Sequence, residues 1–311
     1  MRVVINSIMV HPYQMALFWG KEYVVIYNAS YKECVRRRHP QLLGQALKKG
    51  WKEAYDKIHV HLASCRKGTS IVRSGEIAPV DRVDVDEECY FDWTLTPIVE
   101  KAGNVGGVLW QQYEGTARIL QNRRRAMLQS LRQSTANAQK TIDFWPGVLE
   151  AFDSNVYDTP FVLLYEVVAS EARRLGERGI PVGHPVAPRV INISDYTGLF
   201  ADDIREALQD GRKRVNKNLL EYDHMHLLTR RGFKAPCSTA VVIPILPASG
   251  AGPYHSEAFI ILGINPRRRL DDDYEIWINQ IQDNISHYLA GVRNAEMLVG
   301  QAMQEQLAGL S

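Results

Sequence analysis

Residues 89–113 read CYFDWTLTPIVEKAGNVGGVLWQQY, and this stretch decides the class of fold. In its first half, polar or hydroxyl-bearing side chains alternate with Phe91, Trp93 and Leu95. Such strict alternation predicts a β-strand with two different faces. The residues KAG form a plausible turn to a second strand-like segment over 104–113, so we predict an antiparallel hairpin.

The residues before this hairpin alternate between strand and helix patterns. FWGKEYVVIYN (18–28) is rich in aromatic and β-branched residues and predicts two adjoining strands. Residues 29–66 place apolar side chains at intervals of three or four, which indicates helices. A further strand is expected at SIVRSGEI (70–77), followed by an acidic loop at DRVDVDEE (81–88). This order indicates an α+β domain whose antiparallel sheet has helices packed on one side.

One long amphipathic helix is predicted over residues 114–145, where scattered apolar side chains interrupt a sequence rich in Arg and Gln. Pro146 closes this helix or opens the next one. We therefore divide the chain into an N-terminal domain (1–113), a helical linker (114–145), a second domain (146–292) and a C-terminal helical extension (293–311).

The second domain repeats the α+β pattern. Strands are expected at PFVLLYEVV (160–168), STAVVIPIL (238–246) and EAFIILGIN (257–265). A helix is expected over 194–211, with Ser194 or Asp195 as its N-cap and Gly211 at its end. A long helix then runs from Asp271 toward the end of the chain, with its apolar side chains on one face.

The composition excludes several classes of protein. The chain has 311 residues and a formal net charge of +2, so it lacks the strong basic character of nucleic-acid-binding domains. Its four cysteines form no CxxC pair, which indicates reduced thiols in a cytoplasmic protein rather than a zinc site. No apolar run approaches the roughly 18 residues that span a bilayer, and no signal peptide is apparent. We expect a location inside the cell and neither nucleic acid nor membrane as a partner.

The segment FWGKEYVVIYNASYKECVRRRHPQLLGQAL (18–47) resembles the PAS-like domain near the N-terminus of bacterial and fungal hybrid sensor histidine kinases. The hairpin at 89–110 is similar to a second motif of that domain, with Thr96 where Ser is more usual. The residues of the first motif that match are Trp19, Gly20, Glu22, Tyr27, Asn28, Tyr31, His39, Pro40 and Gly44.

Two later segments, GIPVGHPVAP (179–188) and FIILGINPRRRLDDDYEIWINQI (259–281), resemble the GAF domain that follows in these kinases. The resemblance implies the sensory input module of a two-component phosphorelay, which passes a ligand or redox signal through its helices. It also implies a parallel homodimer formed along the long helices, and a histidine kinase or another phosphorelay protein as partner. The chain stops at Ser311, before the family's phosphoacceptor and ATP-binding regions, so we expect that it is not an enzyme.

Residues that bear reactive groups do not form a catalytic motif. His287 lacks the acidic residue and the proline that follow a phosphoacceptor histidine in the family. The arginine runs at 123–125 and 267–269 indicate a solvated helix face and a charge-paired loop. On a helix, His59 and His61 do not share a face and are poorly placed to hold a metal. His224 and His226 lie in a loop or helix with Asp223 nearby, where we expect solvated or capping histidines. We predict no catalytic residue and no metal ligand.

Aromatic side chains of the N-terminal domain are the remaining candidates for a binding site. They suit a pocket between sheet and helices for a small molecule such as haem or a flavin, or else they form the core. No cofactor is identified. The candidate pocket residues are Tyr27, Tyr31, Trp51, Tyr90, Trp93 and Trp110.

Two other functions remain open. The chain is alternatively an interaction scaffold whose pockets are filled by side chains, or a small-molecule enzyme on a PAS or GAF fold. The enzyme requires a cleft that holds a nucleophile and a base within hydrogen-bond reach. GAF-fold sulfoxide reductases use several cysteines in one domain, whereas the second domain here has only Cys237.

Overall fold

The computed structural model describes residues 2–77, 80–82, 85–222, 231–246 and 256–308. Two compact units make up the chain, residues 1–120 and 121–311. Helix α5 begins in the first unit and continues in the second.

A five-stranded antiparallel sheet forms the centre of the first unit, with the strand order β2-β1-β7-β6-β3. Strand β1 lies between β2 and β7, so that Phe18 is opposite both Val25 and Val108. The hairpin predicted from residues 89–113 is the pair β6 and β7. The strands are β1 (Gln14–Trp19), β2 (Val24–Tyr27), β3 (Ile71–Ile77), β6 (Tyr90–Val99) and β7 (Val105–Glu114).

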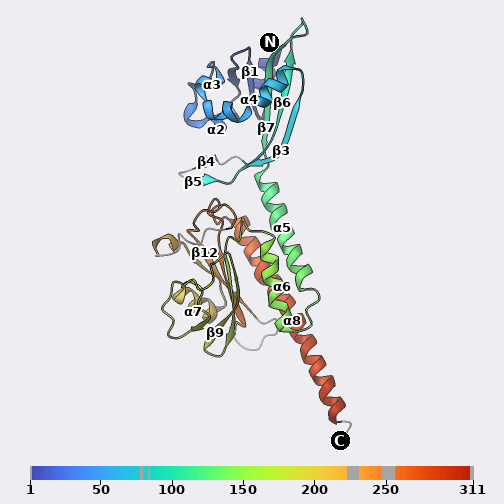
Figure 1. Cartoon of the computed structure of the whole chain (residues 1–311), viewed down its shortest axis with the longest axis vertical. Helices are drawn as coiled ribbons and strands as arrows, with labels where there is room; N and C mark the ends of the chain where they lie inside the picture. The colour runs from blue at the N-terminus through green and yellow to red at the C-terminus, as the bar shows by residue number, and fades with distance from the viewer. Residues whose placement is uncertain (1, 78–79, 83–84, 223–230, 247–255, 309–311) are drawn as a thin grey trace. The chain divides into compact units, whose positions relative to one another are not determined.

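Helices cover both faces of this sheet, most of them on one side (Figure 1). On that side, Phe18, Trp93 and Trp110 form a core with Leu62 of α4. On the other face, α1 packs Ile8 against β1. The helical segments are α1 (Arg2–Met9), α2 (Lys32–Val35), the 3-10 turn η1 (Arg36–Arg38), α3 (Leu47–Gly50) and α4 (Lys52–Arg66).

The acidic stretch at 81–88 is not the loop that the sequence suggested. Strands β4 (Val80–Arg82) and β5 (Val85–Glu87) pair antiparallel as a separate two-stranded sheet. Each of these strands is only three residues long, too short for the alternation that identifies a strand in a sequence.

The single linker helix predicted from the sequence is two helices, α5 (Thr116–Thr135) and α6 (Thr141–Asp153). At the end of α5, the Ser134 hydroxyl donates to the Gly147 carbonyl of α6 (2.7 Å). At the start of α6, both the backbone N–H and the hydroxyl of Thr141 donate to Glu296 of α8. These side-chain contacts hold a break at residues 136–140, where the sequence has neither Pro nor Gly.

A six-stranded antiparallel sheet forms the centre of the second unit, in the order β10-β9-β8-β13-β12-β11. Strands β12 and β13 are buried along their whole length, because hydrophobic cores lie against both faces. The α+β class predicted from the sequence, with two main antiparallel sheets and flanking helices, is confirmed. The strands are β8 (Val162–Val168), β9 (Glu171–Arg178), β10 (Val190–Asn192), β11 (Arg214–Asn216), β12 (Ala240–Ile245) and β13 (Ala258–Gly263).

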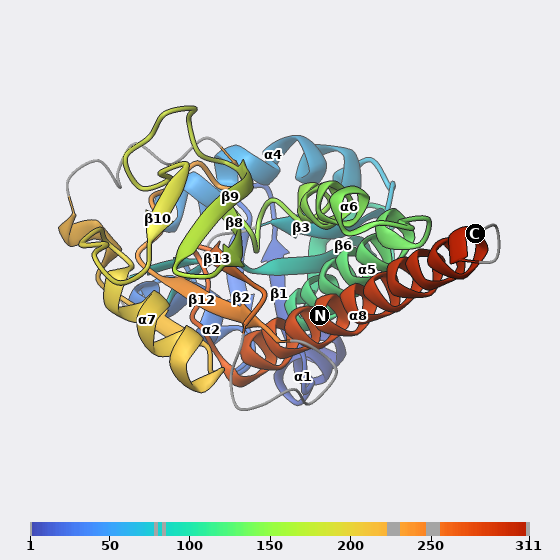
Figure 2. The same ribbon diagram turned by 90° about the horizontal axis from the view of Figure 1, so that it is seen from below.

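Helices α6 and α8 pack on one face of this sheet and α7 on the other (Figure 2). Helix α7 (Ala201–Asp210) begins later than predicted, because residues 194–200 form turns, and it ends at Gly211 in the left-handed conformation. The 3-10 turn η2 (Leu219–Glu221) follows. The long helix predicted from Asp271 onward is α8 (Asp272–Ala308). Across the part of the chain that the structure describes, no helix has the length and hydropathy needed to cross a membrane.

Candidate functional site

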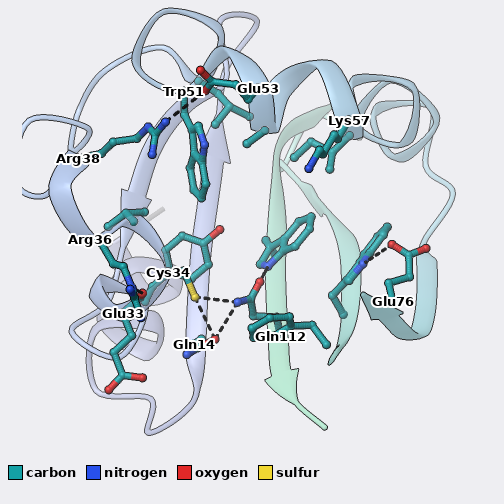
Figure 3. Close-up of a pocket in the computed structure, with 18 of the residues that line it drawn as sticks. Gln14, Glu33, Cys34, Arg36, Arg38, Trp51, Glu53, Lys57, Glu76 and Gln112 are labelled. Carbon is teal, nitrogen blue, oxygen red and sulfur yellow. Dashed lines mark hydrogen bonds and ion pairs between the residues drawn. The ribbon is translucent and has the colours of Figure 1, made fainter. Parts of the chain in front are cut away.

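The first unit contains a pocket of about 570 Å³ between its sheet and its helices (Figure 3). Strands β1, β6 and β7 supply one wall, and α2, η1 and α4 supply the other. The apolar lining is largely aromatic, because the alternating residues of β6 and β7 turn Phe91, Trp93 and Trp110 toward the helices. A hollow of this volume matches the range of small-molecule sites.

Six aromatic residues were predicted from the sequence to line a pocket. Four of them do so: Tyr31, Trp51, Trp93 and Trp110. The other two do not. Tyr27 lies in the core, where its hydroxyl is 2.9 Å from Nδ1 of His39. Tyr90 alternates with Phe91 and so belongs to the opposite face of β6, where its hydroxyl donates to Glu88.

Both indole groups on the sheet wall are fixed by hydrogen bonds. Trp93 Nε1 donates to Glu76 (3.0 Å) and Trp110 Nε1 donates to Gln112 (2.8 Å). The two rings stack on one another with centroids 4.9 Å apart and an interplanar angle of 14°. The indole N–H groups are therefore used within the protein, and the pocket receives carbon-rich ring surface from these residues.

A polar group in the pocket was missed by the sequence analysis. Gln112 Nε2 donates to Gln14 Oε1 (2.7 Å) and lies 2.8 Å from Cys34 Sγ (Figure 3). Cys34 Sγ in turn lies 3.1 Å from Gln14 Oε1. Gln112 follows Trp110 by two residues on β7, so strand alternation alone placed it on the same wall. Its two partners come from distant parts of the sequence and gave no local signal.

Charged residues surround the helix side of the pocket. Arg36, Arg37 and Arg38 of η1 and Lys57 of α4 all line it. Arg38 is paired with Glu53 (3.3 Å) and lies over the Trp51 ring. These groups bring basic side chains to a cavity whose interior is mostly apolar.

The sheet wall of the pocket is continuous with helix α5. Strand β7 carries Trp110, Gln112 and Glu114 along the pocket, and α5 begins two residues later at Thr116. The Thr116 hydroxyl donates to Glu114 (3.0 Å) and accepts the backbone N–H of Tyr90 (3.0 Å). The first turn of α5 is therefore hydrogen-bonded to the strand that forms the pocket wall.

A second connection joins β6 to the same helix. The Asp92 carboxylate, next to Trp93, accepts the backbone N–H of Gly75 (2.7 Å) and an N–H of Arg118 of α5 (2.8 Å). Asp92 and Trp93 are adjacent on β6, so one residue of this strand lines the pocket and the next one contacts α5.

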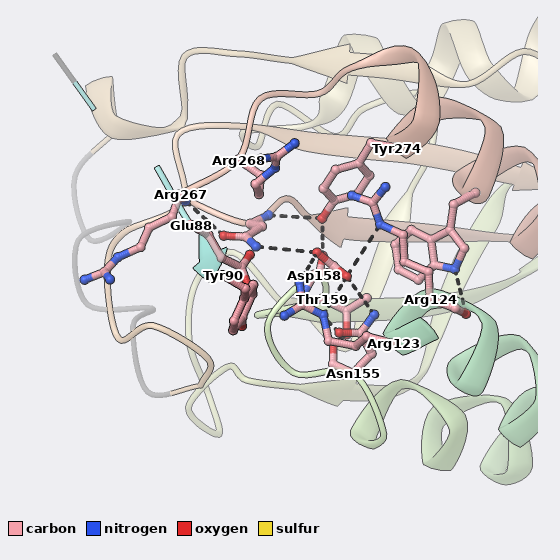
Figure 4. Close-up of polar contacts among 12 residues, drawn as sticks. Glu88, Tyr90, Arg123, Arg124, Asn155, Asp158, Thr159, Arg267, Arg268 and Tyr274 are labelled. Carbon is pink, nitrogen blue, oxygen red and sulfur yellow. Dashed lines mark hydrogen bonds and ion pairs between the residues drawn. The ribbon is translucent and has the colours of Figure 1, made fainter. Parts of the chain in front are cut away.

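In the second unit, residues in the first half of α5 lie beside a buried carboxylate (Figure 4). The Asp158 side chain is fully buried, and Arg123 binds it with two hydrogen bonds, Nη2 to Oδ1 (2.8 Å) and Nε to Oδ2 (3.0 Å). The Nε of Arg124 lies 3.6 Å from Oδ2, and Asn155 also donates to it (2.9 Å). We name Arg123, Arg124, Asn155, Asp158 and Tyr274 the Asp158 cluster.

Arg124 connects the Asp158 cluster to α8. Its guanidinium lies over the rings of Tyr274 (4.2 Å) and Trp277 (5.6 Å), and its carbonyl accepts the Trp277 N–H. The Tyr274 hydroxyl donates to the Asp158 carbonyl, and burial raises the pKa of this tyrosine. The predicted solvated face at 123–125 is wrong for two of its three arginines, because they neutralise a buried carboxylate; Arg125 is exposed.

The second arginine run fits its prediction in part. Arg268 pairs with Asp271 (3.2 Å), and Asp271 accepts the backbone N–H of Tyr274 at the start of α8. Asp272, Asp273 and Glu275 lie in the first turn, where the helix dipole favours acidic groups.

Cysteine and histidine side chains do not assemble into a metal site among the residues that the structure describes. His61 lines the pocket, whereas His59 is exposed on α4. His224 and His226 lie outside the described residues. Burial raises the pKa of the Cys65 thiol to about 11 and that of Cys237 to about 12.

Comparison with known proteins gave structural likeness only. No family model matches the sequence, and no curated protein matches it. Similar solved structures include fRMsr of Staphylococcus aureus in complex with substrate, with 15% identity and a TM-score of 0.40 over 54% of this chain and 95% of that one. A segment of a methyl-accepting chemotaxis protein covers 52% of this chain and 96% of its own, at 11% identity and a TM-score of 0.38. A GAF domain of an Acinetobacter phosphoenolpyruvate-protein phosphotransferase covers 57% and 95%, at 9% identity and a TM-score of 0.37.

These comparisons correct one prediction. The prediction that the chain is not an enzyme is wrong as a general statement, because fRMsr, a methionine sulfoxide reductase, is among the structures that it resembles. The same set contains GAF domains and a segment of a chemotaxis protein. No family match accompanies the resemblance to histidine kinases.

Proposed function

We propose that this chain is a sensory module in which the first unit binds a small organic molecule and helices α5 and α8 carry the response. The observation that carries the proposal is the pocket of about 570 Å³, lined by aromatic side chains and continuous through β7 with α5. An unfilled hollow of this size disfavours the alternative of a scaffold whose pockets are closed by side chains.

The response follows a path of direct contacts. A ligand that touches Gln112 or Glu114 shifts the end of β7 and with it the first turn of α5. Two helical turns further, about 10 Å along the axis, Arg123 binds the buried Asp158 carboxylate. Arg124 and Tyr274 extend this contact to α8. A ligand alters the helices only if it binds one arrangement of this path more tightly than another.

We also propose that the module serves a histidine kinase phosphorelay as a parallel homodimer. The basis is the resemblance of the two units to PAS and GAF input domains. Support comes from the last turns of α8, which expose apolar side chains suited to self-association. These are Met297, Leu298, Val299, Met303 and Leu307. Sedimentation over a range of concentrations measures the state of assembly; a monomer throughout would contradict this part of the proposal.

The central experiment compares two variants of helix α4. Ala54 lines the pocket, and Ala63 is exposed on the same helix outside it. Ala54→Phe places a ring in the cavity, whereas Ala63→Phe makes the same chemical change in solvent. Small molecules that bind the wild-type chain are found by native mass spectrometry and a thermal-shift screen, and their affinities are then measured by calorimetry.

We expect binding to survive in Ala63→Phe and to be lost in Ala54→Phe, with both variants folded by circular dichroism. Bound ligand is expected to change hydrogen exchange at Tyr274 and the following turns of α8. If no small molecule binds the wild-type chain, or if both variants bind equally, the proposal is wrong. Binding without any change in α8 would remove the helix mechanism.

A further inference from the structure

The charged residues that line the pocket are equal in number for the two signs, but they differ in how many already have a charged partner. Four basic residues and four glutamates line the pocket, and two of these glutamates have ion-pair partners. Glu53 forms an ion pair with Arg38. The Glu76 carboxylate accepts a hydrogen bond from the indole N–H of Trp93 and lies 3.7 Å from Arg73. Such paired carboxylates contribute little further negative potential to the cavity.

The basic side chains of the pocket are less engaged. In the described part of the chain, Arg37 and Lys57 have no ion pair, and Arg36 uses its Nε on the backbone carbonyl of Glu33. Figure 3 shows Lys57 extending from α4 toward the cavity, while the Glu33 carboxylate points away from it. Glu114 also lines the pocket and accepts a hydrogen bond from the neutral Thr116 hydroxyl. The positive charges of Arg36, Arg37 and Lys57 therefore outnumber the negative charge that faces the pocket.

The interior of the pocket suits an uncharged, aromatic part of a ligand. Aromatic rings dominate it, and the amide of Gln112 already donates to Gln14 and Cys34. The indole N–H groups of Trp93 and Trp110 are also engaged. A ligand thus finds flat carbon surface inside and strong donors for an anion at the helix side, where a guanidinium suits a carboxylate.

We propose that the ligand of this pocket is an aromatic carboxylate, with its rings among the aromatic side chains and its carboxylate beside Arg37 and Lys57. This inference rests on the proposed function, since it names the class of molecule that the module senses. Flat rings gain more than an alkyl chain from contact with aromatic walls, because ring pairs attract beyond their buried area. The cavity volume leaves room for two fused rings and their carboxylate.

Three probes of similar size separate the parts of this proposal: 2-naphthoate, its neutral analogue 2-naphthamide, and the aliphatic acid octanoate. Calorimetry on the full chain is expected to show 2-naphthoate binding about tenfold or more tighter than either of the others. The affinity for 2-naphthoate is expected to fall as salt is added, because the basic side chains are partly exposed.

Matched charge variants test the assigned residues. Arg37→Gln with Lys57→Gln is expected to weaken 2-naphthoate about tenfold and leave 2-naphthamide unchanged. Lys21→Gln with Lys101→Gln removes the same charge from exposed positions outside the pocket lining and is expected to change neither. Ala54→Phe is expected to abolish binding of 2-naphthoate.

The outcomes distinguish this inference from the proposed function. Equal binding of the amide, tighter binding of octanoate, or no effect of the Arg37 and Lys57 substitutions overturns the ligand class and leaves a pocket for another molecule. Failure of 2-naphthoate to bind, while another compound binds in an Ala54-dependent way, does the same. Binding that persists in Ala54→Phe places the probe elsewhere and also overturns the inference.

Discussion

Replacing Asp158 by Asn tests the role of the buried carboxylate in the second unit. The substitution keeps the shape of the side chain and removes its charge, while the guanidiniums of Arg123 and Arg124 stay in place. Their side chains are only 13% and 7% exposed, and that of Asp158 is 0% exposed. Removing one partner of a buried ion pair costs about 3–5 kcal/mol, because the remaining charge loses its compensation.

We therefore expect Asp158→Asn to lower the free energy of unfolding of the second unit by at least about 3 kcal/mol. The matched control is Asp202→Asn, which breaks an exposed pair with Arg205 whose side chains are 89% and 37% exposed. An exposed pair of this kind is worth less than about 1 kcal/mol.

Native-state hydrogen exchange resolves the two units, which a single unfolding curve of a two-unit chain does not. The most protected amides of β8 and β13 are expected to exchange roughly a hundredfold faster in Asp158→Asn, and less than about fivefold faster in Asp202→Asn. Equal effects of the two substitutions on hydrogen exchange would refute the reasoning. They would show that burial does not determine how much a paired carboxylate contributes to the free energy of unfolding.

Three further predictions concern helices and thiols. Gly147→Ala is expected to lower the free energy of unfolding in urea by about 1–3 kcal/mol, because the new methyl group lies 2.4 Å from a carbonyl oxygen of α5. The matched control Gly291→Ala places its methyl group where no atom lies within 4 Å, and it is expected to raise that free energy by about 0.5–1 kcal/mol. Iodoacetamide at pH 8 is expected to modify the half-buried Cys34 before Cys237, whose pKa burial raises to about 12, as measured by peptide mass spectrometry. Hydrogen bonds from Thr141 at the start of α6 lower the pKa of Glu296 below its ordinary 4.5. The stability that these bonds give the start of α6 is therefore present above pH 4.5 and is lost as the pH falls through the lowered pKa. Glu296→Gln is expected to speed hydrogen exchange at the start of α6 at neutral pH, and this difference from the wild-type chain is expected to shrink as the pH falls through that pKa.

The strands were the most predictable part of the fold. Buried strands such as β12 and β13 appear as short unbroken apolar runs, and the β6–β7 hairpin appears as alternation around a turn. These patterns are local, so the sequence displays them directly. The break between α5 and α6 was missed because Pro146, which suggested the boundary, lies inside α6, and long-range contacts from α8 fix the true start of that helix.

The candidate site was only partly predictable, for a similar reason. Trp93 and Trp110 lie on strands whose alternation sets the face that they occupy, so their place in the pocket followed from the pattern. The contact of Gln112 with Cys34 joins residues that are 78 positions apart in the sequence and has no periodic signal. Arg123 and Arg124 were predicted to be exposed to solvent, because Asp158 is more than 30 residues away in the sequence and no local pattern indicates that it contacts them.

Tandem arginines on one helix have a mechanical consequence. Neighbouring side chains leave an α-helix about 100° apart around its axis, yet Arg123 and Arg124 both reach the same carboxylate. The buried Asp158 carboxylate therefore holds α5 at two consecutive residues that leave the helix in different directions. A rotation or a displacement of α5 would lengthen at least one of these contacts.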